Sequence, residues 1–401
     1  MTTAGDPGAA AESDFARAVE CHRGGQLDQA VTLYERALAA NPALAEAHRL
    51  LGLLSIQRGQ TGEAERRLRE AIRLAPDNAK AYDNLAVVLH AQNRNDEALP
   101  ALRTAVDLAP ANEMFLVNLG NLLGELDRRA EAIDAFRRAA AAAPRNANIH
   151  QRLASELLRT GDAAGALRHL DTAIELGGPN ATSLSLKAVA LGTLGDADGF
   201  NALMDFDRLV VCRHIGEAHG AASLAAFNES LAAIVAENSL HEDHTTINGL
   251  DSAEILGRPN PATAALRRFV YGEIEARLRT LPEAHPFAAM APRKWATKSW
   301  GVKMWRTGYQ ETHIHHKAWL SGVYYVQLPE VVRKGQKGNA GWIEFGRGPD
   351  DLTAVAPPNV RLIQPVEGML ITFPSYMWHR TVPFEGKRDR ISIAFDVTRT
   401  A

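Results

Sequence analysis

Two consecutive stretches of the chain share one pattern of small, large and turn-forming residues. Residues 61–94 read TGEAERRLREAIRLAPDNAKAYDNLAVVLHAQNR, and residues 95–128 read NDEALPALRTAVDLAPANEMFLVNLGNLLGELDR. Matching places in the two stretches hold the same residue, and in the first stretch these residues are Ala64, Leu68, Ala71, Pro76 and Leu85. Self-similarity at a fixed period of this length is typical of proteins built from stacked pairs of antiparallel helices.

The period of 34 residues extends in both directions. Prolines recur in register at Pro42, Pro76, Pro110 and Pro144, and Pro179 follows one residue late. Alanines in this pattern allow two helices to approach closely, large residues fill the next layer, and proline ends each second helix. Glycine, asparagine or aspartate stands at the turn inside each pair, where left-handed backbone is needed. Five repeats and a partial sixth, which would cap the stack, predict an all-α solenoid over residues 13–195.

These repeats resemble the tetratricopeptide repeat (TPR) family, whose solenoids bind another polypeptide in a concave groove. By this resemblance Asn84 and Asn118 occupy a groove-facing place immediately before the core leucines, and Asn121 lies nearby. An amide both donates and accepts hydrogen bonds, so amides at repeat spacing can bind an extended peptide through its backbone. The arrangement is similar to the asparagine ladder of protein O-GlcNAc transferases, although Leu50 and Arg152 interrupt it on either side. The alternatives are that these asparagines are merely solvated, and that the repeats serve homo-oligomerisation or docking to a partner protein.

The repeat pattern fades after residue 195. Residues 196–291 are expected to form a helical linker or support region, with amphipathic helices around 224–234 and 266–278. Beyond Pro292 the composition shifts toward tryptophan, tyrosine, β-branched residues and glycine turns. This pattern predicts short strands at residues 299–306, 319–327, 341–345, 361–365, 368–373, 379–383 and 390–397. The predicted fold is an all-α TPR solenoid followed by an α+β domain whose core, residues 292–401, is a double-stranded β-helix or jelly roll.

Residues 311–316, ETHIHH, concentrate imidazole side chains just before a predicted strand. In extended backbone His313 and His315 point to one face, so both can bind one metal ion, while His316 points to the other face. A third imidazole, His379, follows a strong strand nearer the C-terminus. These residues predict a three-histidine metal site.

A second motif follows the hairpin turn after His379. Arg390 and Ser392 stand two residues apart on one face of a predicted strand. A fixed guanidinium with a hydroxyl beside it can hold one end of a dicarboxylate. The alternative is that Arg390 only forms a surface ion pair with Glu385 or Asp389.

Three phrases, YQETHIHHKAWLSGVYYVQLP, GWIEF and PVEGMLITFPSYMWHRTVPFEGKRDRISIAFD, resemble a bacterial and phage subgroup of the iron(II)- and 2-oxoglutarate-dependent oxygenases. The resemblance covers about residues 298–397, and the segment HTTINGLDS is expected to belong to the same module. It implies iron(II), 2-oxoglutarate and O2 as the reactive partners. It also implies that His313, His315 and His379 are the catalytic iron ligands, that Arg390 and Ser392 bind the distal carboxylate of 2-oxoglutarate, and that Tyr325 adds a hydrogen bond to it.

The chain departs from the wider superfamily at the second metal ligand. The superfamily usually has a carboxylate two residues after its first histidine, and this chain has His315 there. The interpretation favoured here is a three-histidine site, with Glu311 as the alternative third ligand because it shares a strand face with His313. A three-histidine dioxygenase that uses no 2-oxoglutarate is a further alternative, although it would leave Arg390 and Ser392 without a role.

The composition excludes several other functions. Lysine and arginine number 44 against 47 aspartates and glutamates, so the net charge of −3 does not favour nucleic acid or an anionic membrane. Two cysteines are too few for a disulfide-stapled secreted fold, and no window has the length and apolarity of a membrane span. We therefore expect a cytoplasmic protein. The cluster at residues 241–244, HEDH, has no matching partner set and is not expected to bind metal.

Together these features predict an iron(II)/2-oxoglutarate dioxygenase that hydroxylates a residue of a peptide or protein recruited by the TPR arm. A fused binding arm raises the local concentration of its target near the metal. Demethylation and desaturation begin with the same chemistry and stay open. One alternative is an oxygenase acting on a small molecule, with the repeats used for oligomerisation or docking, and another is a non-catalytic TPR scaffold with a degenerate cupin-like barrel.

Overall fold

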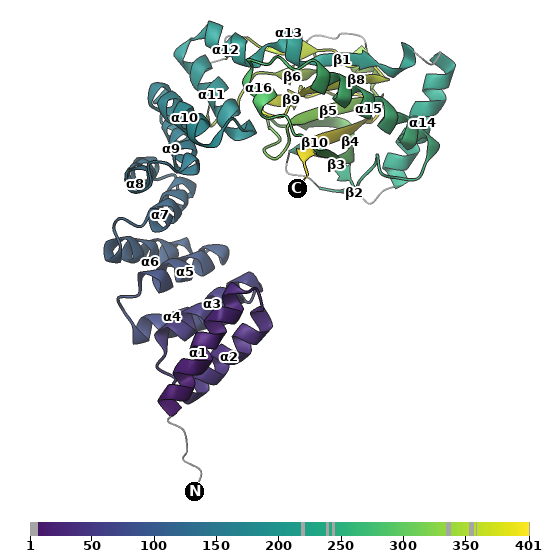
Figure 1. Ribbon diagram of the computed structural model, residues 1–401. Coiled ribbons are helices and arrows are strands. Elements are labelled where there is room, and N and C mark those ends of the chain that lie inside the picture. The colour runs from purple at the N-terminus through teal and green to yellow at the C-terminus, as the bar shows by residue number, and fades with distance from the viewer. Residues whose placement is uncertain are drawn as a thin grey trace. The chain divides into compact units, whose positions relative to one another are not determined.

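The computed structural model describes residues 7–217, 221–237, 240–242, 245–333, 338–352, 357 and 359–400. The chain divides into two compact units, Met1–Arg145 and Asn146–Ala401. The first unit is entirely helical in its described part, and the second joins further helices to two antiparallel sheets (Figure 1).

The first unit consists of successive antiparallel helix pairs. These are α1 (Pro7–Arg23) with α2 (Leu27–Ala40), α3 (Ala45–Gln57) with α4 (Thr61–Leu74), α5 (Ala79–Ala91) with α6 (Asn95–Leu108), and α7 (Glu113–Glu125) with α8 (Arg129–Ala142). Their packing confirms the periodic pattern, since Ala64, Leu68 and Ala71 are fully buried. A Cβ on Gly52 would lie 2.8 Å from Leu68 Cγ, which shows how closely helices within a pair approach. The turn residue Asn93 has φ of 59°, the left-handed conformation that its place in the repeat predicts.

The second unit begins with α9 (Ala147–Arg159), α10 (Ala163–Gly177), α11 (Ala181–Leu194) and α12 (Ala197–Met204). Apolar residues of α11 belong to the same buried cluster as the strands that follow. Two polar contacts fix this packing: Trp378 Nε1 donates to the carbonyl of Ser185 at 3.1 Å, and Thr182 Oγ1 lies 2.9 Å from His316 Nδ1. The last helical repeat is therefore part of the core of the β-rich domain.

Most of the strands form one large antiparallel sheet with the order β1-β8-β5-β10-β4-β3-β2. The bounds are β1 (Val211–His214), β2 (Leu240–His241), β3 (Thr246–Ser252), β4 (Trp295–Gln310), β5 (Leu320–Gln327), β8 (Met369–Pro374) and β10 (Arg390–Arg399). A smaller sheet has the order β7-β6-β9, from β6 (Ile343–Phe345), β7 (Arg361–Ile363) and β9 (His379–Thr381). The strands predicted between residues 299 and 397 are confirmed.

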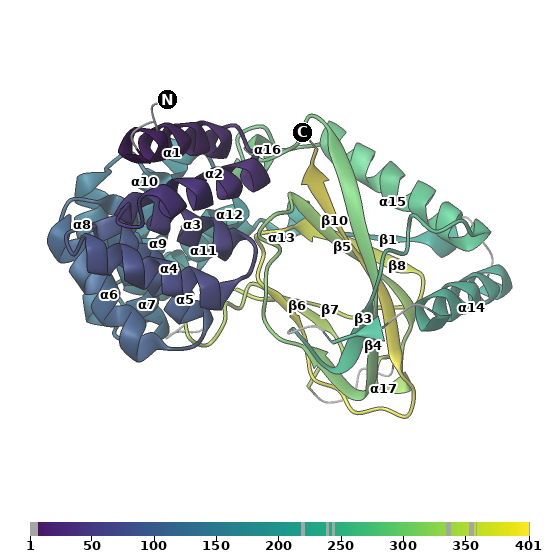
Figure 2. The same cartoon turned by 90° about the horizontal axis from the view of Figure 1, so that it is seen from below.

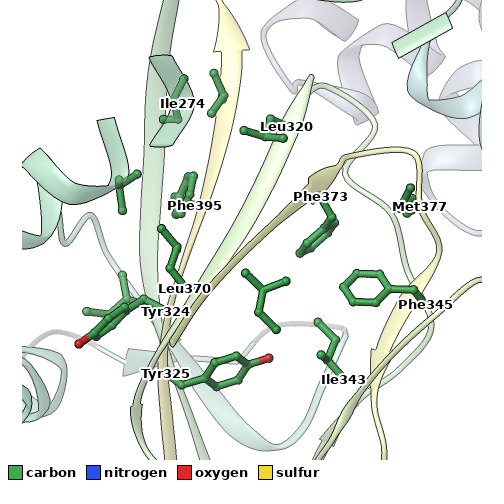
Figure 3. Close-up of a cluster of buried hydrophobic side chains, with 14 of the residues drawn as sticks. Ile274, Leu320, Tyr324, Tyr325, Ile343, Phe345, Leu370, Phe373, Met377 and Phe395 are labelled. Atoms are coloured by element: carbon green, nitrogen blue, oxygen red, sulfur yellow. The ribbon is translucent and has the colours of Figure 1, made fainter. Parts of the chain in front are cut away.

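Helices α14 (Ala221–Glu237) and α15 (Pro261–Arg279) lie on the side of the large sheet opposite the small one (Figure 2). Tyr324 and Tyr325 are consecutive on β5 and point to opposite sides of this sheet (Figure 3). Tyr324 faces the helices, where its hydroxyl donates to Asn228 Oδ1 of α14 at 2.7 Å. Tyr325 faces the space between the two sheets, which places it on the side where the candidate site lies.

The segment 196–291 contains strands that the sequence did not predict. Its two amphipathic helices are confirmed as α14 and α15, but β1 pairs with β8 and β3 pairs with β4. The alternation of side chains along β3 is broken at Asn248, which has φ of 52°, and the pairing with β4 shifts in register between Ile247 and Gly249. The sequence of β3 therefore lacks the regular alternation that predicts a strand. The remaining elements are short: α13 (Phe206–Leu209), η1 (Ile215–Glu217), α16 (Pro286–Ala289) and α17 (Glu330–Arg333). None of the described helices has the length and apolarity to cross a membrane.

Candidate metal centre

Three histidines from two distant parts of the chain meet at one end of the space between the sheets. His313 and His315 follow β4, and His379 begins β9. The backbone joins the two segments directly, because His313 N donates to His379 O at 3.0 Å and His379 N donates to His313 O at 3.1 Å. One nitrogen from each ring lies within 4.8 Å of the others. This spacing fits three ligands of one transition-metal ion.

The hydrogen bonds of the three rings fix which nitrogen faces the metal position. Nδ1 of His313 lies 2.7 Å from the carbonyl of Glu311, and Nδ1 of His379 lies 3.0 Å from that of Met377. Nδ1 of His315 lies 2.9 Å from a carboxylate oxygen of Asp396. Each neighbour is an acceptor, so each Nδ1 carries the proton and each Nε2 keeps the lone pair through which an imidazole binds a metal.

The charge state of His379 also suits a metal ligand. Burial holds the pKa of His379 well below its usual range, and the nearby imidazoles of His313 and His315 lower it further. The ring is therefore neutral at physiological pH, and a neutral imidazole is the form that binds a divalent cation.

His316 and Glu311 lie outside this group. His316 points away from the three rings toward Thr182, as its place in the extended segment predicts. Glu311 is exposed, and among the described residues the cluster that can hold a metal ion consists of the three histidines without it. The geometry thus places His315, rather than Glu311, beside His313 and His379.

Arg390 is a buried cation with no anionic partner among the described residues. It begins β10 and is only 2% exposed, and its guanidinium carbon lies 5.1 Å from the ring centroid of Tyr325. Among the described residues no carboxylate pairs with it, because the carboxylate of Asp389 lies 3.4 Å from Lys303 Nζ. Arg390 Nε and the Tyr325 hydroxyl are both buried without a hydrogen-bond partner in that part of the chain. A buried guanidinium and hydroxyl in this state are suited to an anionic ligand.

Ser392 completes this group of donors. It is 2% exposed and lies opposite Tyr325 in the pairing of β10 with β5. Burial raises the pKa of Tyr325 to about 12 and lowers the pKa of Arg390, so the phenol keeps its proton and remains a donor. One cavity of about 340 Å³ is lined both by these three residues and by the three histidines. The predicted metal ligands and the predicted carboxylate fork therefore face one another.

Comparisons with known families agree with this geometry. Residues 298–396 match the family described as "Putative 2OG-Fe(II) oxygenase". Residues 20–55 match a TPR repeat family, and residues 56–113 and 117–181 match a tetratricopeptide repeat family. The chain therefore combines TPR repeats with a segment that matches a family of 2OG-Fe(II) oxygenases. No curated protein matches it.

Several solved structures are similar to part of this chain. The structure of YrrB, described as a TPR protein with an unusual peptide-binding site, is 22% identical, covers 43% of this chain and 90% of its own, and has a TM-score of 0.39. PilF of Pseudomonas aeruginosa is 21% identical over 56% of this chain and 99% of its own, with a TM-score of 0.45. MamA from Desulfovibrio magneticus is 22% identical over 42% of this chain and 94% of its own, with a TM-score of 0.39.

Other residues of the oxygenase domain line the cavity without having been predicted. Asp396 lies on the same face of β10 as Arg390 and Ser392, since alternate residues of a strand share a face. Extending that alternation by two more steps was the signal that could have found it. Trp300 and His241 also line the cavity, whereas Asp243 and His244 of the HEDH cluster lie outside the described residues.

The predicted peptide-binding asparagines lie in the first unit. Asn84, Asn118 and Asn121 are all half-buried, on α5 and α7. Asn118 Nδ2 donates to Asp83 of the preceding repeat at 2.7 Å, and burial raises the pKa of that carboxyl. Asn84 Nδ2 has no partner among the described residues. The amide nitrogen of Asn118 is thus engaged between repeats, and that of Asn84 is buried.

Proposed function

We propose that the protein is an iron(II)- and 2-oxoglutarate-dependent dioxygenase that hydroxylates a residue of a peptide or protein bound by the TPR repeats. The observation that carries the proposal is the shared cavity, which has three converging imidazoles at one place and, at another, a buried guanidinium with no carboxylate partner among the described residues. In this proposal the two antiparallel sheets form the double-stranded β-helix of the oxygenases.

Different residues of the cavity would bind the metal ion and the cosubstrate. His313, His315 and His379 would hold iron(II) through Nε2, and such a site leaves coordination positions open for 2-oxoglutarate and O2. When bound, iron supplies the oxidative chemistry that turns 2-oxoglutarate and O2 into succinate, carbon dioxide and a hydroxylated product.

The far end of the cavity would orient the cosubstrate. Arg390 pairs with the distal carboxylate of 2-oxoglutarate, while the hydroxyls of Ser392 and Tyr325 donate to its oxygens. Burial strengthens these charge-assisted hydrogen bonds, because water does not compete for the carboxylate. Val323 and Phe373 line the same cavity and present apolar surface to the carbon chain of the cosubstrate.

Succinate formation tests the enzymatic proposal. The full-length protein, incubated in air with iron(II) and 2-oxoglutarate, should form succinate, and the His379→Ala variant should form almost none. His316→Ala is the matched control, because His316 neighbours a ligand in sequence and points away from the site. Equal succinate from the wild type and His379→Ala would reject the activity.

The proposal of a polypeptide substrate rests on the repeats. Asn84 and Asn118 place half-buried amides at matching positions of successive repeats, and Asn121 lies one turn further along the same helix as Asn118. An extended peptide can use such groups along its backbone. The Asn84→Ala/Asn118→Ala variant should retain succinate formation without substrate and lose the addition of one oxygen atom to its peptide target, measured by mass spectrometry. Unchanged peptide hydroxylation would remove these residues from the substrate site, and oxygen added only to a small molecule would favour the alternative substrate class.

A further inference from the structure

Asp396 is held beside the metal position by two hydrogen bonds. One carboxylate oxygen, Oδ2, lies 2.9 Å from His315 Nδ1, and the other, Oδ1, accepts from Ser321 Oγ at 2.6 Å. Ser321 is 1% exposed and lies directly opposite Asp396 in the pairing of β5 with β10. The carboxylate is therefore fixed from both sides, and it is mostly shielded from solvent.

This contact distinguishes His315 from the other two histidines. His313 and His379 donate their Nδ1 protons to backbone carbonyls, whereas His315 donates to a carboxylate. A carbonyl orients an imidazole. A carboxylate orients it and also makes it a stronger electron donor, since the full negative charge polarises the ring toward the metal.

A second contact restrains the His315 ring on its face. The indole of Trp300 stacks on it with a centroid distance of 5.8 Å and an interplanar angle of 28°. Trp300 belongs to β4, which pairs with β10 and places Trp300 opposite Ala394. Stacking on Trp300 thus restrains the tilt of the His315 ring, and the hydrogen bond to Asp396 restrains its rotation.

We propose that Asp396 is a positioning residue that supplies, through His315, the negative charge that a directly bound carboxylate provides in related sites. The inference rests on the proposed iron site. Three neutral ligands leave the full double charge on the metal, and a carboxylate separated from it by one imidazole offsets part of that charge. The site then needs no carboxylate in direct contact with the metal.

The test compares metal binding in two variants of Asp396. Asp396→Asn keeps the shape and an acceptor oxygen but removes the charge, and Asp396→Ala removes both. Asp251→Asn is the matched control, because it removes the charge of a second carboxylate that lines the same cavity and that accepts a hydrogen bond from Thr246 Oγ1. Titration of the full-length apoprotein with Co(II), followed by visible absorption, should give about 10-fold weaker binding for Asp396→Asn and up to about 100-fold weaker binding for Asp396→Ala. The control should bind as the wild type does.

A spectroscopic measurement separates the charge from a merely structural role. The anaerobic complex of iron(II) with 2-oxoglutarate has a visible charge-transfer band from metal to ligand, and a less electron-rich iron moves it to shorter wavelength. Asp396→Asn should show this shift while the control does not. Wild-type affinity and an unmoved band in Asp396→Asn would overturn the role of Asp396 and leave the proposed function standing. Failure of the wild type to bind Co(II) or iron(II) would overturn both. If Asp396→Ala does not fold, Asp396→Asn alone decides the result.

Discussion

Replacing Arg390 by methionine should stabilise the apoprotein and at the same time abolish its response to 2-oxoglutarate. The guanidinium is 2% exposed and has no anionic partner among the described residues. An uncompensated buried charge costs about 3 kcal/mol, and its removal recovers that amount. Methionine keeps most of the aliphatic stem, and the small void left by the guanidinium costs about 1 kcal/mol. The variant should therefore be more stable than the wild type by about 2 kcal/mol before ligand is added.

Adding 2-oxoglutarate should make the wild type more stable than the Arg390→Met variant. With Mn(II) in place of iron and 2-oxoglutarate at one hundred times its dissociation constant, the wild type should gain about 2.7 kcal/mol, and the variant should gain almost nothing from the cosubstrate. Urea unfolding followed by tryptophan fluorescence measures this in the β-rich domain alone, because all 6 tryptophans lie between residues 295 and 378. The buffer must lack carboxylates, phosphate and sulfate, which would pair with Arg390.

Arg388→Met provides the comparison. Arg388 is exposed and lies 3.7 Å from Glu367, so its loss should change stability by no more than about 0.5 kcal/mol and leave the response to 2-oxoglutarate intact. An Arg390→Met protein that is less stable than the wild type without ligand, or equally stabilised by 2-oxoglutarate, would refute the assignment of Arg390 as the anion-binding residue.

Three further changes test the packing around the site. Gly322→Ala should lower the free energy of unfolding by about 1–3 kcal/mol in the same urea assay, because the added methyl would overlap the Phe395 ring; no loss would mean that the ring moves freely. Trp378→Phe removes the bond to Ser185 and should cost about 1 kcal/mol, and an unchanged urea midpoint would contradict the role of that bond in holding α11. His285 is kept neutral by burial, which lowers its pKa, so the unfolded chain takes up a proton first as the pH falls below about 6.5. Stability should then fall by at most about 1.4 kcal/mol per pH unit from this group, and more shallowly in His285→Asn; parallel pH profiles of the two proteins would show that His285 does not contribute.

The helical repeats were predictable because the same packing contacts recur in every helix pair. The same places must hold small residues, and where one of them is glycine, as at Gly52, the neighbouring leucine occupies the space that a Cβ would need. A period in the sequence therefore reports directly on contacts in the fold. The contact of Asn118 with Asp83 was not predictable in this way, because it joins two repeats through residues that the period does not constrain.

The β-rich domain was predictable strand by strand and only partly as a sheet. Local alternation identifies a strand, but its partner is chosen by residues far away, as when Val211 pairs with Thr372 at the edge of the large sheet. The candidate site followed from spacing, since His313, His315 and Arg390 each sit on a face that the alternation fixes. Asp396 was missed because nothing local marks a carboxylate as the neighbour of a histidine 81 positions away.

The bond from Trp378 to Ser185 limits how the repeat array can change in length. The last repeat packs into the hydrophobic core of the β-rich domain, and Trp378 immediately precedes a candidate metal ligand. A repeat inserted between α10 and α11, or a truncation that begins at residue 298, would uncover apolar surface next to the metal position. Gain or loss of repeats on the N-terminal side of α9 would leave that surface covered. The N-terminal repeats are therefore free to vary in number, whereas α10 and α11 cannot change without exposing the core beside the candidate metal site.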